Sequence, residues 1–209
     1  MDTTPAVTRF DDLYRSRTAP WVIGEPQPAI VELERAGKLH DNVLDIGCGT
    51  GEHTIMLTGL GYDVLGVDFA PAAIEQARAN AAQRRVDARF EIADAMNLDA
   101  TDVYQTIIDS ALFHIFDDAD RAKYMRSVHM ALRPGGVVHV LALSDAGRGF
   151  GPEVSESDVR GAFGDGWVME ALDSATYRGV VQEMHTEAIG LPVGTLVDEP
   201  AWLVRARRV

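Results

Sequence analysis

Short apolar runs rich in β-branched residues alternate along this chain with longer stretches of helical spacing. The runs cover residues 42–47, 63–69, 88–94, 104–110 and 135–143, and Gly, Asp or Pro bounds each of them. Brief apolar runs between such breakers are typical of buried strands. Because strands that alternate with helices form parallel sheets, the pattern predicts an α/β fold in which crossover helices cover the sheet.

The helical stretches between these runs have recognisable starts and stops. Pro71 suits the first turn of a helix over residues 68–85, whose alanine-rich body has high helix propensity. Residues 117–136 begin with aspartates, carry apolar residues at helical spacing and end at Pro-Gly-Gly. Residues 155–163 open with a Ser-x-x-Asp capping-box pattern. We therefore expect a helix in each of these three stretches.

Two further strands, over residues 166–172 and 201–209, complete the predicted architecture, a three-layer α/β/α sandwich. No repeat or linker divides the chain, so we expect a single domain over residues 1–209. Within it, residues 43–145 form the ligand-binding core, and residues 146–209 supply the substrate side and the final strands.

An N-terminal extension over residues 1–42 precedes the first strand, and prolines and a glycine lead into a helix within residues 20–39. The extension either covers the carboxyl edge of the sheet, where it acts as a lid, or packs as a helix on the flank of the domain. The sequence leaves both placements open.

Composition narrows the classes of function. The chain has 209 residues, of which 46% are hydrophobic and 24% charged, as in an ordinary folded domain. Its formal net charge of −13 repels nucleic-acid backbones and anionic lipid surfaces, so we expect neither as a partner. No apolar stretch approaches the roughly 20 residues of a membrane span, and no signal-peptide core opens the chain. We therefore expect a cytoplasmic protein.

Cys48 is the only cysteine, so no internal disulfide can form, and no Cys/His cluster has the spacing of a zinc site. We expect no bound metal. Nothing in the sequence marks Cys48 as a nucleophile. A monomer is favoured over an oligomer.

The first predicted strand runs into a glycine-rich turn, VLDIGCGTG, at residues 43–51. Ligands of open parallel sheets bind beyond the carboxyl ends of the strands, so this turn is the expected binding site. The dinucleotide fingerprint G-x-G-x-x-G needs a glycine where this chain has Glu52. Asp45 and Glu52 would place negative charge on both sides of a pyrophosphate, at a cost of about a few kcal/mol. A ligand with a sulfonium and an ammonium fits better, which indicates S-adenosylmethionine.

Aspartates at three later strand ends suit the same ligand. Asp68 ends the second strand near the offset at which an acidic residue takes ribose hydroxyls, and Phe69 follows, placed to lie against adenine. Asp94 follows the third strand, where it would accept from the adenine amino group, and Asp109 ends the fourth, near the methionine portion. One such aspartate is more often a helix cap or turn former. Four in step with the glycine turn favour a nucleoside site.

These motifs resemble those of the class I S-adenosylmethionine-dependent methyltransferases over residues 40–145. VLDIGCGTG is similar to the family's glycine-rich loop, VLGVDFAPAAIEQAR to its ribose-binding strand and helix, ADAM to its adenine-contact segment, and LRPGG to the turn before its fifth strand. The resemblance implies a Rossmann-like, mostly parallel sheet of seven strands with the last antiparallel, and S-adenosylmethionine as cofactor. The implied cofactor contacts are Asp45, Gly47, Gly49, Asp68, Phe69, Asp94, Ala95, Asp109 and Ser110.

Narrower likenesses extend the candidate site. PWVIGEPQPAI, at residues 20–30, is similar to the N-terminal segment of the thiopurine and tellurite-resistance branch, in which a tryptophan lies by the cofactor. That likeness adds Trp21 and Gln27 to the candidate site. The overall pattern also looks like actinobacterial enzymes that methylate toxic heterocycles such as hydroxyquinolones on O or N.

Methyl transfer is an in-line displacement at sulfonium, so the enzyme's main task is to hold the nucleophile about 3 to 3.5 Å from the methyl group. His114, just past the fourth strand, is the best-placed candidate for a general base, which typically adds about 10²–10⁴-fold. The alternative is that His114 bonds a carbonyl or lines a pocket. Phe113 and Phe150 would supply apolar substrate contacts, with the glycine-rich segment 147–153 as a lid.

DSAL, at residues 109–112, stands where amino-group methyltransferases of nucleic acids carry an Asn/Asp-Pro-Pro-aromatic segment, so we expect a small-molecule acceptor. The predicted function is methylation of O, N or S on a small aromatic or heterocyclic compound. The alternatives are a detoxifying thiol or chalcogenide methyltransferase, a non-catalytic S-adenosylmethionine-binding regulator, and a dinucleotide-dependent oxidoreductase. Glu52 and the lack of a Tyr-Lys or Cys/His catalytic arrangement count against the oxidoreductase.

Overall fold

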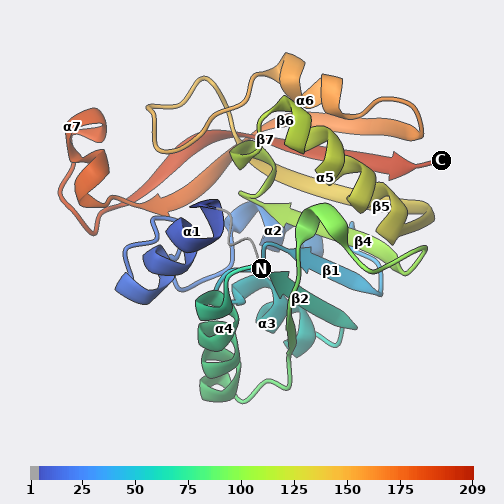
Figure 1. The fold of residues 1–209 in the computed structure, drawn as a ribbon, viewed down its shortest axis with the longest axis horizontal. Coiled ribbons are helices and arrows are strands. Elements are labelled where there is room, and N and C mark those ends of the chain that lie inside the picture. Colours follow the sequence, from blue (N-terminus) through green and yellow to red (C-terminus); the bar gives the residue numbers. More distant parts are fainter. Residues whose placement is uncertain (1–4) are drawn as a thin grey trace.

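One sheet of seven strands forms the middle layer of the protein, whose computed structural model describes residues 5–209 (Figure 1). In chain order the strands are β1 (Val43–Ile46), β2 (Val64–Asp68), β3 (Arg89–Ile92), β4 (Tyr104–Ser110), β5 (Leu132–Leu143), β6 (Trp167–Val180) and β7 (Leu196–Arg208). Their order across the sheet is β3-β2-β1-β4-β5-β7-β6. Neighbours among β1 to β5 pair in parallel, and β7 is antiparallel to β5 and β6. The predicted mostly parallel sheet with an antiparallel last strand is confirmed.

Helices cover both faces of the sheet and complete the predicted three-layer sandwich. They are α1 (Pro5–Ser16), α2 (Pro28–Arg35), α3 (Glu52–Gly59), α4 (Pro71–Arg84), α5 (Asp118–Ala131), α6 (Glu156–Ala162) and α7 (Thr186–Ile189), with 3₁₀ turns η1 (Ala95–Asn97), η2 (Phe113–Ile115) and η3 (Glu183–His185). Val43 of β1 packs with Ile30 of α2 and Leu57 of α3. Its neighbour Leu44 packs with Tyr124 of α5 on the opposite face. Both faces of β1 are therefore buried, which explains its continuous apolar run.

The start of α6 follows its sequence signal in detail. The Ser155 hydroxyl accepts the N–H of Asp158 at 3.1 Å, and the Asp158 carboxylate accepts the N–H of Ser155 at 2.9 Å. This reciprocal pair satisfies two backbone donors that have no partner inside the helix. The predicted capping box is confirmed.

Strand boundaries near the C-terminal half differ from the sequence-based expectation. β6 and β7 form one long hairpin, paired from Trp167↔Arg208 to Val180↔Leu196, and α7 lies by its far end (Figure 1). The two apolar runs mark only part of this hairpin because β6 is an edge strand of mixed burial. β5 begins at Leu132, directly after α5, but its pairing with β4 is interrupted between Leu132 and Val137. LRPGG is therefore an irregular turn within the start of this strand.

The N-terminal extension lies across the carboxyl ends of the strands, between α4 and β6. Near one end, Asp11 of α1 accepts the N–H of Ala72 of α4 at 2.8 Å. Near the other, the amide of Gln27 pairs with both backbone groups of Arg178 on β6, at 2.7 and 2.8 Å. Helix α1 was not among the helices that the sequence predicted. The segment from α1 to Gln27 thus lies over the carboxyl edge, whereas α2, the helix that the sequence predicted, packs against β1 and α3 on one face of the sheet. Each of the two placements left open therefore describes part of the extension, and its action as a lid stays a prediction.

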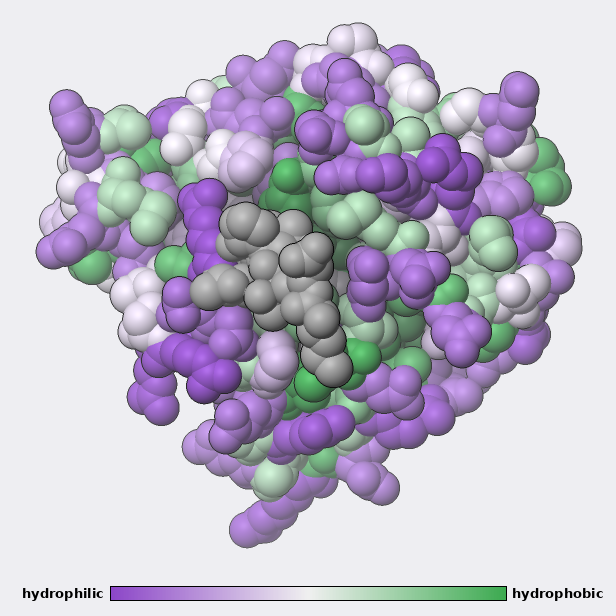
Figure 2. Space-filling model, viewed as in Figure 1, coloured by the Kyte–Doolittle hydropathy of each residue, from purple (hydrophilic) through white to green (hydrophobic). Residues whose placement is uncertain are grey.

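Hydrophilic residues make up most of the rim of the face shown in Figure 2, and hydrophobic residues are seen nearer its middle. A cavity of about 560 Å³ lies between α5 and α6, where Arg121, His129 and Trp167 line it. No residue at the carboxyl ends of the strands lines that cavity, so it is separate from the candidate site. Between residues 5 and 209, no helix has the length and apolar character needed to cross a membrane.

Candidate active site

The glycine-rich turn after β1 is packed too closely for side chains at two of its positions. Gly51 has a φ of +86°, and a Cβ there would lie 2.8 Å from the ring of Phe90. Gly49 has a φ of +54°, and a Cβ there would lie 3.0 Å from the hydroxyl of Tyr14 in α1. Residues with a Cβ rarely adopt positive φ, so both positions favour glycine on backbone and steric grounds. The turn therefore lies between β3 and the N-terminal extension.

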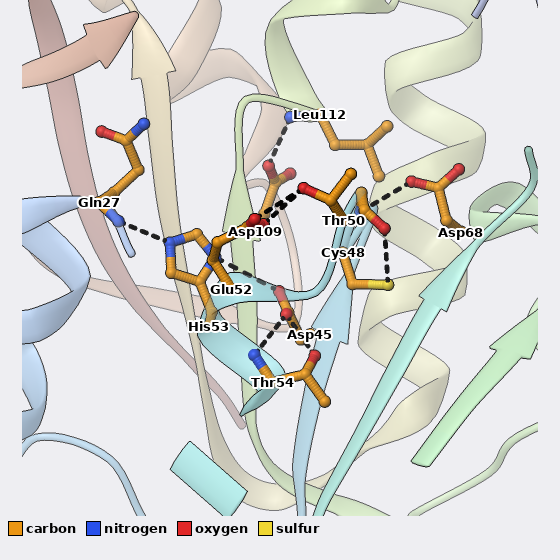
Figure 3. A network of polar contacts seen from close by, with 11 residues as sticks. Gln27, Asp45, Cys48, Thr50, Glu52, His53, Thr54, Asp68, Asp109 and Leu112 are labelled. Atoms are coloured by element: carbon orange, nitrogen blue, oxygen red, sulfur yellow. Dashed lines mark hydrogen bonds and ion pairs between the residues drawn. The ribbon is translucent and has the colours of Figure 1, made fainter. Parts of the chain in front are cut away.

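Asp45 of β1 braces the first turn of α3 (Figure 3). Its Oδ2 accepts the backbone N–H of Thr54 at 3.1 Å and the Thr54 hydroxyl at 2.6 Å, and its Oδ1 lies 3.9 Å from Nδ1 of His53. Nε2 of His53 accepts the N–H of Gln27 at 3.0 Å, so the neutral ring carries its proton on Nδ1, which faces Asp45. One buried carboxylate thus connects β1 with α3 and, through His53, with the extension.

Asp68 holds the glycine turn against the end of β2 (Figure 3). Its Oδ2 accepts the N–H of Gly49 at 3.0 Å, and its Oδ1 accepts the N–H of Ala70 at 2.9 Å. Burial raises the pKa of this carboxyl to about 6, Asp45 adds to the rise, and the backbone donors oppose it. The structure brings Asp68 and the glycine turn together, and the predicted contact of Asp68 with ribose stays a prediction.

Residues predicted to meet adenine lie at the neighbouring strand ends. Asp94 is exposed and caps η1, because one of its oxygens accepts the N–H of Met96 at 2.9 Å. Ala95 beside it is half-buried, as is Phe69 after β2. The second oxygen of Asp94 leaves an acceptor at the surface for a ligand.

Aromatic rings join the extension to the end of β2. The ring of Phe69 lies edge-on to that of Phe10 at 5.7 Å, and Phe10 lies 5.5 Å from Trp21. Nε1–H of Trp21 donates to the hydroxyl of Tyr14 at 2.8 Å. The predicted Trp21 and Phe69 thus belong to one group, to which the structure adds Phe10 and Tyr14. The sequence signal for these two is their spacing of i to i+4, which places both on one face of α1.

Asp109 lies at the end of β4 with 0% exposure, which corrects the prediction that its side chain contacts the cofactor. Its Oδ1 accepts the N–H groups of Leu112 and Phe113, and its Oδ2 accepts the hydroxyl of Tyr124 at 2.6 Å. Burial raises its pKa to about 6, although these bonds oppose the rise. They hold a turn in which Ala111 has a φ of +74°, a conformation that costs about 1 kcal/mol or more. Asp109 therefore shapes the site from inside the protein.

Phe113 is placed differently from the prediction as well. Its ring is 0% exposed, stacks 6.4 Å from Phe163, and has the guanidinium of Arg121 at 5.1 Å. From this position in the core beside α5 the ring cannot line a substrate site, which corrects that part of the prediction. A lone aromatic in a turn has no periodicity from which its direction could be read. Ser110, at the end of β4, is half-buried and remains accessible.

His114 lies in η2, and the main chain orients its ring. Nδ1 accepts the N–H of Leu143 on β5 at 3.0 Å. Burial lowers the pKa of the ring to about 4, so the ring is neutral near pH 7. In a neutral imidazole whose Nδ1 accepts a hydrogen bond, Nε2 carries the proton. Nε2 is then a donor, and the predicted role of general base needs a lone pair that this tautomer does not have there.

The glycine-rich segment 147–153 is fastened to the sheet. The guanidinium of Arg148 pairs with the carboxylate of Glu199 on β7. Glu199 is 0% exposed, and its carboxylate also accepts the backbone N–H of Arg148 at 3.3 Å. Phe150 is buried beside Tyr177 of β6, in an apolar cluster that the extension borders. The predicted lid is therefore packed down in this structure, and Phe150 faces the apolar interior under it.

Negative charge gathers around the glycine turn. Asp45, Asp68 and Glu52 form no ion pair with a Lys or Arg of residues 5–209. Burial raises the pKa of Cys48 well above its usual value, and these three carboxylates add to the rise. The thiol therefore stays protonated and unreactive. Uncompensated carboxylates fit the sulfonium and ammonium of S-adenosylmethionine and repel a pyrophosphate. In the described part of the chain, no His, Cys, Asp and Glu side chains gather in a group that could hold a metal ion.

Comparisons with known proteins agree with a site that suits S-adenosylmethionine. A family model described as a methyltransferase domain matches residues 43–136. The 2-heptyl-1-hydroxyquinolin-4(1H)-one methyltransferase of Mycobacteroides abscessus is 37% identical over 181 residues, which are 79% of this chain and 79% of that protein. Probable thiol methyltransferase 2 of Arabidopsis thaliana is 26% identical over 154 residues, which are 71% of this chain and 68% of the relative.

A solved structure extends the match to nearly the whole fold. It comes from work on "Conversion of a Disulfide Bond into a Thioacetal Group during Echinomycin Biosynthesis", and it is 37% identical with a TM-score of 0.88. The match covers 97% of this chain and 93% of that chain. Because identity of this level extends over most of both proteins in two cases, this chain belongs to the class I S-adenosylmethionine-dependent methyltransferases, enzymes that use S-adenosylmethionine as methyl donor.

Proposed function

We propose that this methyltransferase acts on a ring-bound oxygen or nitrogen of a small heterocycle of the 1-hydroxyquinolin-4-one type. The observation that carries the proposal is the buried, neutral ring of His114 in η2, just past β4, whose Nε2–H is a donor. Leu143, which holds that ring, belongs to the same apolar cluster as Phe150 and Tyr177. A flat apolar ring with an oxygen acceptor suits this combination. The Mycobacteroides abscessus relative, named for such a substrate, supports it.

On the cofactor side, Asp68 is assigned the ribose, and the backbone at Gly47 and Gly49 is assigned to the methionine portion of the cofactor. Asp45 contributes negative charge from beneath the turn. Ser110 remains at the accessible end of β4. The remaining assigned contacts form the adenine side and the cover of the site, and they are Trp21, Phe69, Asp94 and Ala95.

S-adenosylmethionine supplies a methyl group on an electrophilic sulfonium. An acidic ring hydroxyl needs little activation, so the chain's own part is to position the acceptor and exclude water. The Nε2–H of His114 holds an acceptor oxygen, and the main-chain bond from Leu143 fixes the direction of that donor. Phe150, the buried aromatic residue of segment 147–153, excludes water from the apolar side.

A second candidate function is methylation of sulfur. Two relatives favour it. One is the solved structure at 37% identity, which comes from work on the conversion of a disulfide into a thioacetal, and the other is named as a probable thiol methyltransferase. A soft sulfur nucleophile needs no general base, which agrees equally well with a neutral His114. The two candidates differ in whether the acceptor needs the Nε2–H donor, because a thioether or thiolate is a weak hydrogen-bond acceptor.

A competition among acceptors tests the proposal. The purified protein is incubated with labelled S-adenosylmethionine and 1-hydroxyquinolin-4-ones, phenols, thiols or tellurite, and S-adenosylhomocysteine and the product masses are measured. We expect kcat/KM for a hydroxyquinolone to exceed that for any thiol by about tenfold or more, equivalent to about 1.4 kcal/mol. The reverse order assigns the enzyme to sulfur, and no product with any acceptor indicates the regulatory alternative. Asp68→Ala should abolish turnover, whereas Asp63→Ala, at an exposed position, should not.

A further inference from the structure

Tyr14 of α1 stands over the glycine turn without a role in the site described so far. Its side chain is 5% exposed, and its hydroxyl lies 3.0 Å from the point that a Cβ of Gly49 would occupy. The same hydroxyl accepts Nε1–H of Trp21 at 2.8 Å. The oxygen is therefore directed at the segment of backbone that the cofactor must approach.

The hydroxyl of Tyr14 is available as a donor. The indole of Trp21 uses one lone pair of the oxygen, and no acceptor for the hydroxyl proton is found among residues 5–209. Burial, together with the negative charge of Asp68, raises the pKa of the phenol well above its usual value. The group thus stays protonated at physiological pH, and a protonated phenol whose lone pair is engaged offers its proton to a ligand.

The charges near this donor select the part of the cofactor that it meets. Asp45, Asp68 and Glu52 surround the turn with carboxylates, which suit the ammonium, the sulfonium and the ribose hydroxyls. The methionine carboxylate is the one anionic group of S-adenosylmethionine, and those side chains repel it. An anion placed there needs a donor that cannot itself become negative near pH 7, and Tyr14 is such a donor.

We propose that the Tyr14 hydroxyl binds the methionine carboxylate of the cofactor. The inference rests on S-adenosylmethionine occupying the glycine turn as described under the proposed function. It adds a cofactor-binding residue from the N-terminal extension and gives that extension a part in ligand affinity. Trp21 acts as a positioning residue, because its N–H fixes the rotation of the phenol oxygen and directs the proton away from the indole.

Calorimetric titration with a matched pair of ligands tests this assignment. S-adenosylhomocysteine and its decarboxylated analogue differ only in the carboxylate, and each is titrated into wild type, Tyr14→Phe and the control Tyr62→Phe. Tyr62 bonds Glu34, on the α2 side of the domain, at 3.4 Å. We expect Tyr14→Phe to raise the Kd of S-adenosylhomocysteine about tenfold or more, as for a lost hydrogen bond to a charged group, and to leave the Kd of the decarboxylated analogue within about twofold.

The other outcomes separate the alternatives. Equal weakening of both ligands by Tyr14→Phe would mean that the phenol only packs the extension, and no weakening of either would mean that it has no part in binding; both results overturn the proposal. Trp21→Phe keeps the hydroxyl, so it should retain the preference of wild type for the carboxylated ligand even if overall affinity falls. Failure of wild type to bind either ligand would instead contradict the underlying cofactor assignment.

Discussion

The hydroxyl of Tyr124 in α5 donates a 2.6 Å hydrogen bond to Oδ2 of Asp109 at the end of β4. The other oxygen of Asp109 accepts the N–H groups of Leu112 and Phe113. A strand-end carboxylate that the sequence assigned to a ligand thus has protein donors on both of its oxygens. Through it, α5 fixes the turn that leads from β4 to His114.

Tyr124→Phe should destabilise the fold because it leaves one oxygen of a fully buried carboxylate without a partner. An unsatisfied buried acceptor costs about 1–3 kcal/mol, and more when the acceptor is charged. We expect a loss of at least about 2 kcal/mol in the free energy of unfolding, measured by urea denaturation. Tyr104→Phe, on the half-buried Tyr104 of β4, is the control and should change this free energy by about 0.5 kcal/mol or less. Equal effects of both variants would contradict the assignment.

Asp109→Asn should change how stability depends on pH. Because the pKa of Asp109 is raised from 3.8 to about 6, its contribution to stability is fully present below pH 3.8 and is lost as the pH rises through about 6. Asparagine does not titrate, so the free energy of unfolding of the variant minus that of wild type should rise by about 2.4 kcal/mol from about pH 4 to about pH 7. Other titrating groups cancel in this difference.

Ala111→Gly should stabilise the protein, although glycine is usually unfavourable. The φ of +74° at Ala111 is strained for a residue with a Cβ, and glycine removes that strain. We expect a gain of about 0.5–1 kcal/mol in the free energy of unfolding. The matched change Ala122→Gly, at an exposed position inside α5, should cost about 0.5–1 kcal/mol, since there glycine brings only backbone entropy. The prediction fails if the two substitutions shift stability in the same direction.

Arg148 and Glu199 should couple strongly. Glu199 is 0% exposed, whereas the side chain of Arg148 is 46% exposed, so removal of the arginine leaves a buried carboxylate without its cation. We expect Arg148→Met to lower the free energy of unfolding by about 3 kcal/mol, the low end of the range for removing one partner of a buried ion pair. The double variant with Glu199→Gln should recover most of that loss because no charge remains to be compensated. A double-mutant cycle on urea denaturation measures the coupling, and additive effects would show that the two residues act independently.

The parts of the fold that the sequence predicted are those in which local pattern and tertiary role coincide. β1 is buried on both faces, so its apolar run is continuous, and Gly49 and Gly51 mark a turn that needs positive φ. The capping box at Ser155 is a local signal of the same kind. None of these depends on residues distant in the chain.

The misplaced residues are those whose direction is set by a distant partner. Asp109 stands at the predicted strand end, but Tyr124 and the turn decide that its carboxylate points inward. Phe113 does not belong to a periodic apolar pattern, and its ring packs in the core with residues of α5 and α6. Tyr14 is positioned by Trp21 and by the glycine turn, contacts that no local pattern encodes.

The role of His114 as a hydrogen-bond donor can be distinguished experimentally from that of a general base. Burial lowers its pKa to about 4 and the N–H of Leu143 occupies Nδ1, so Nε2 carries a proton throughout the range from about pH 5.5 to about pH 8. His114→Ala should therefore lower kcat for a hydroxyquinolone about tenfold or more, with the KM for S-adenosylmethionine changed less than about twofold.

The pH profile and a conservative variant distinguish the two roles of His114. As a donor, it gives kcat no inflection of its own in that pH range, so wild type and His114→Ala should show profiles of the same shape. His114→Asn should recover part of the rate, because an amide both accepts from Leu143 and donates to the substrate. If His114 is a base, kcat of wild type should fall below an inflection near pH 4 that His114→Ala removes, so the profile is extended to that pH. Asn should then rescue nothing, since an amide cannot take a proton from the acceptor.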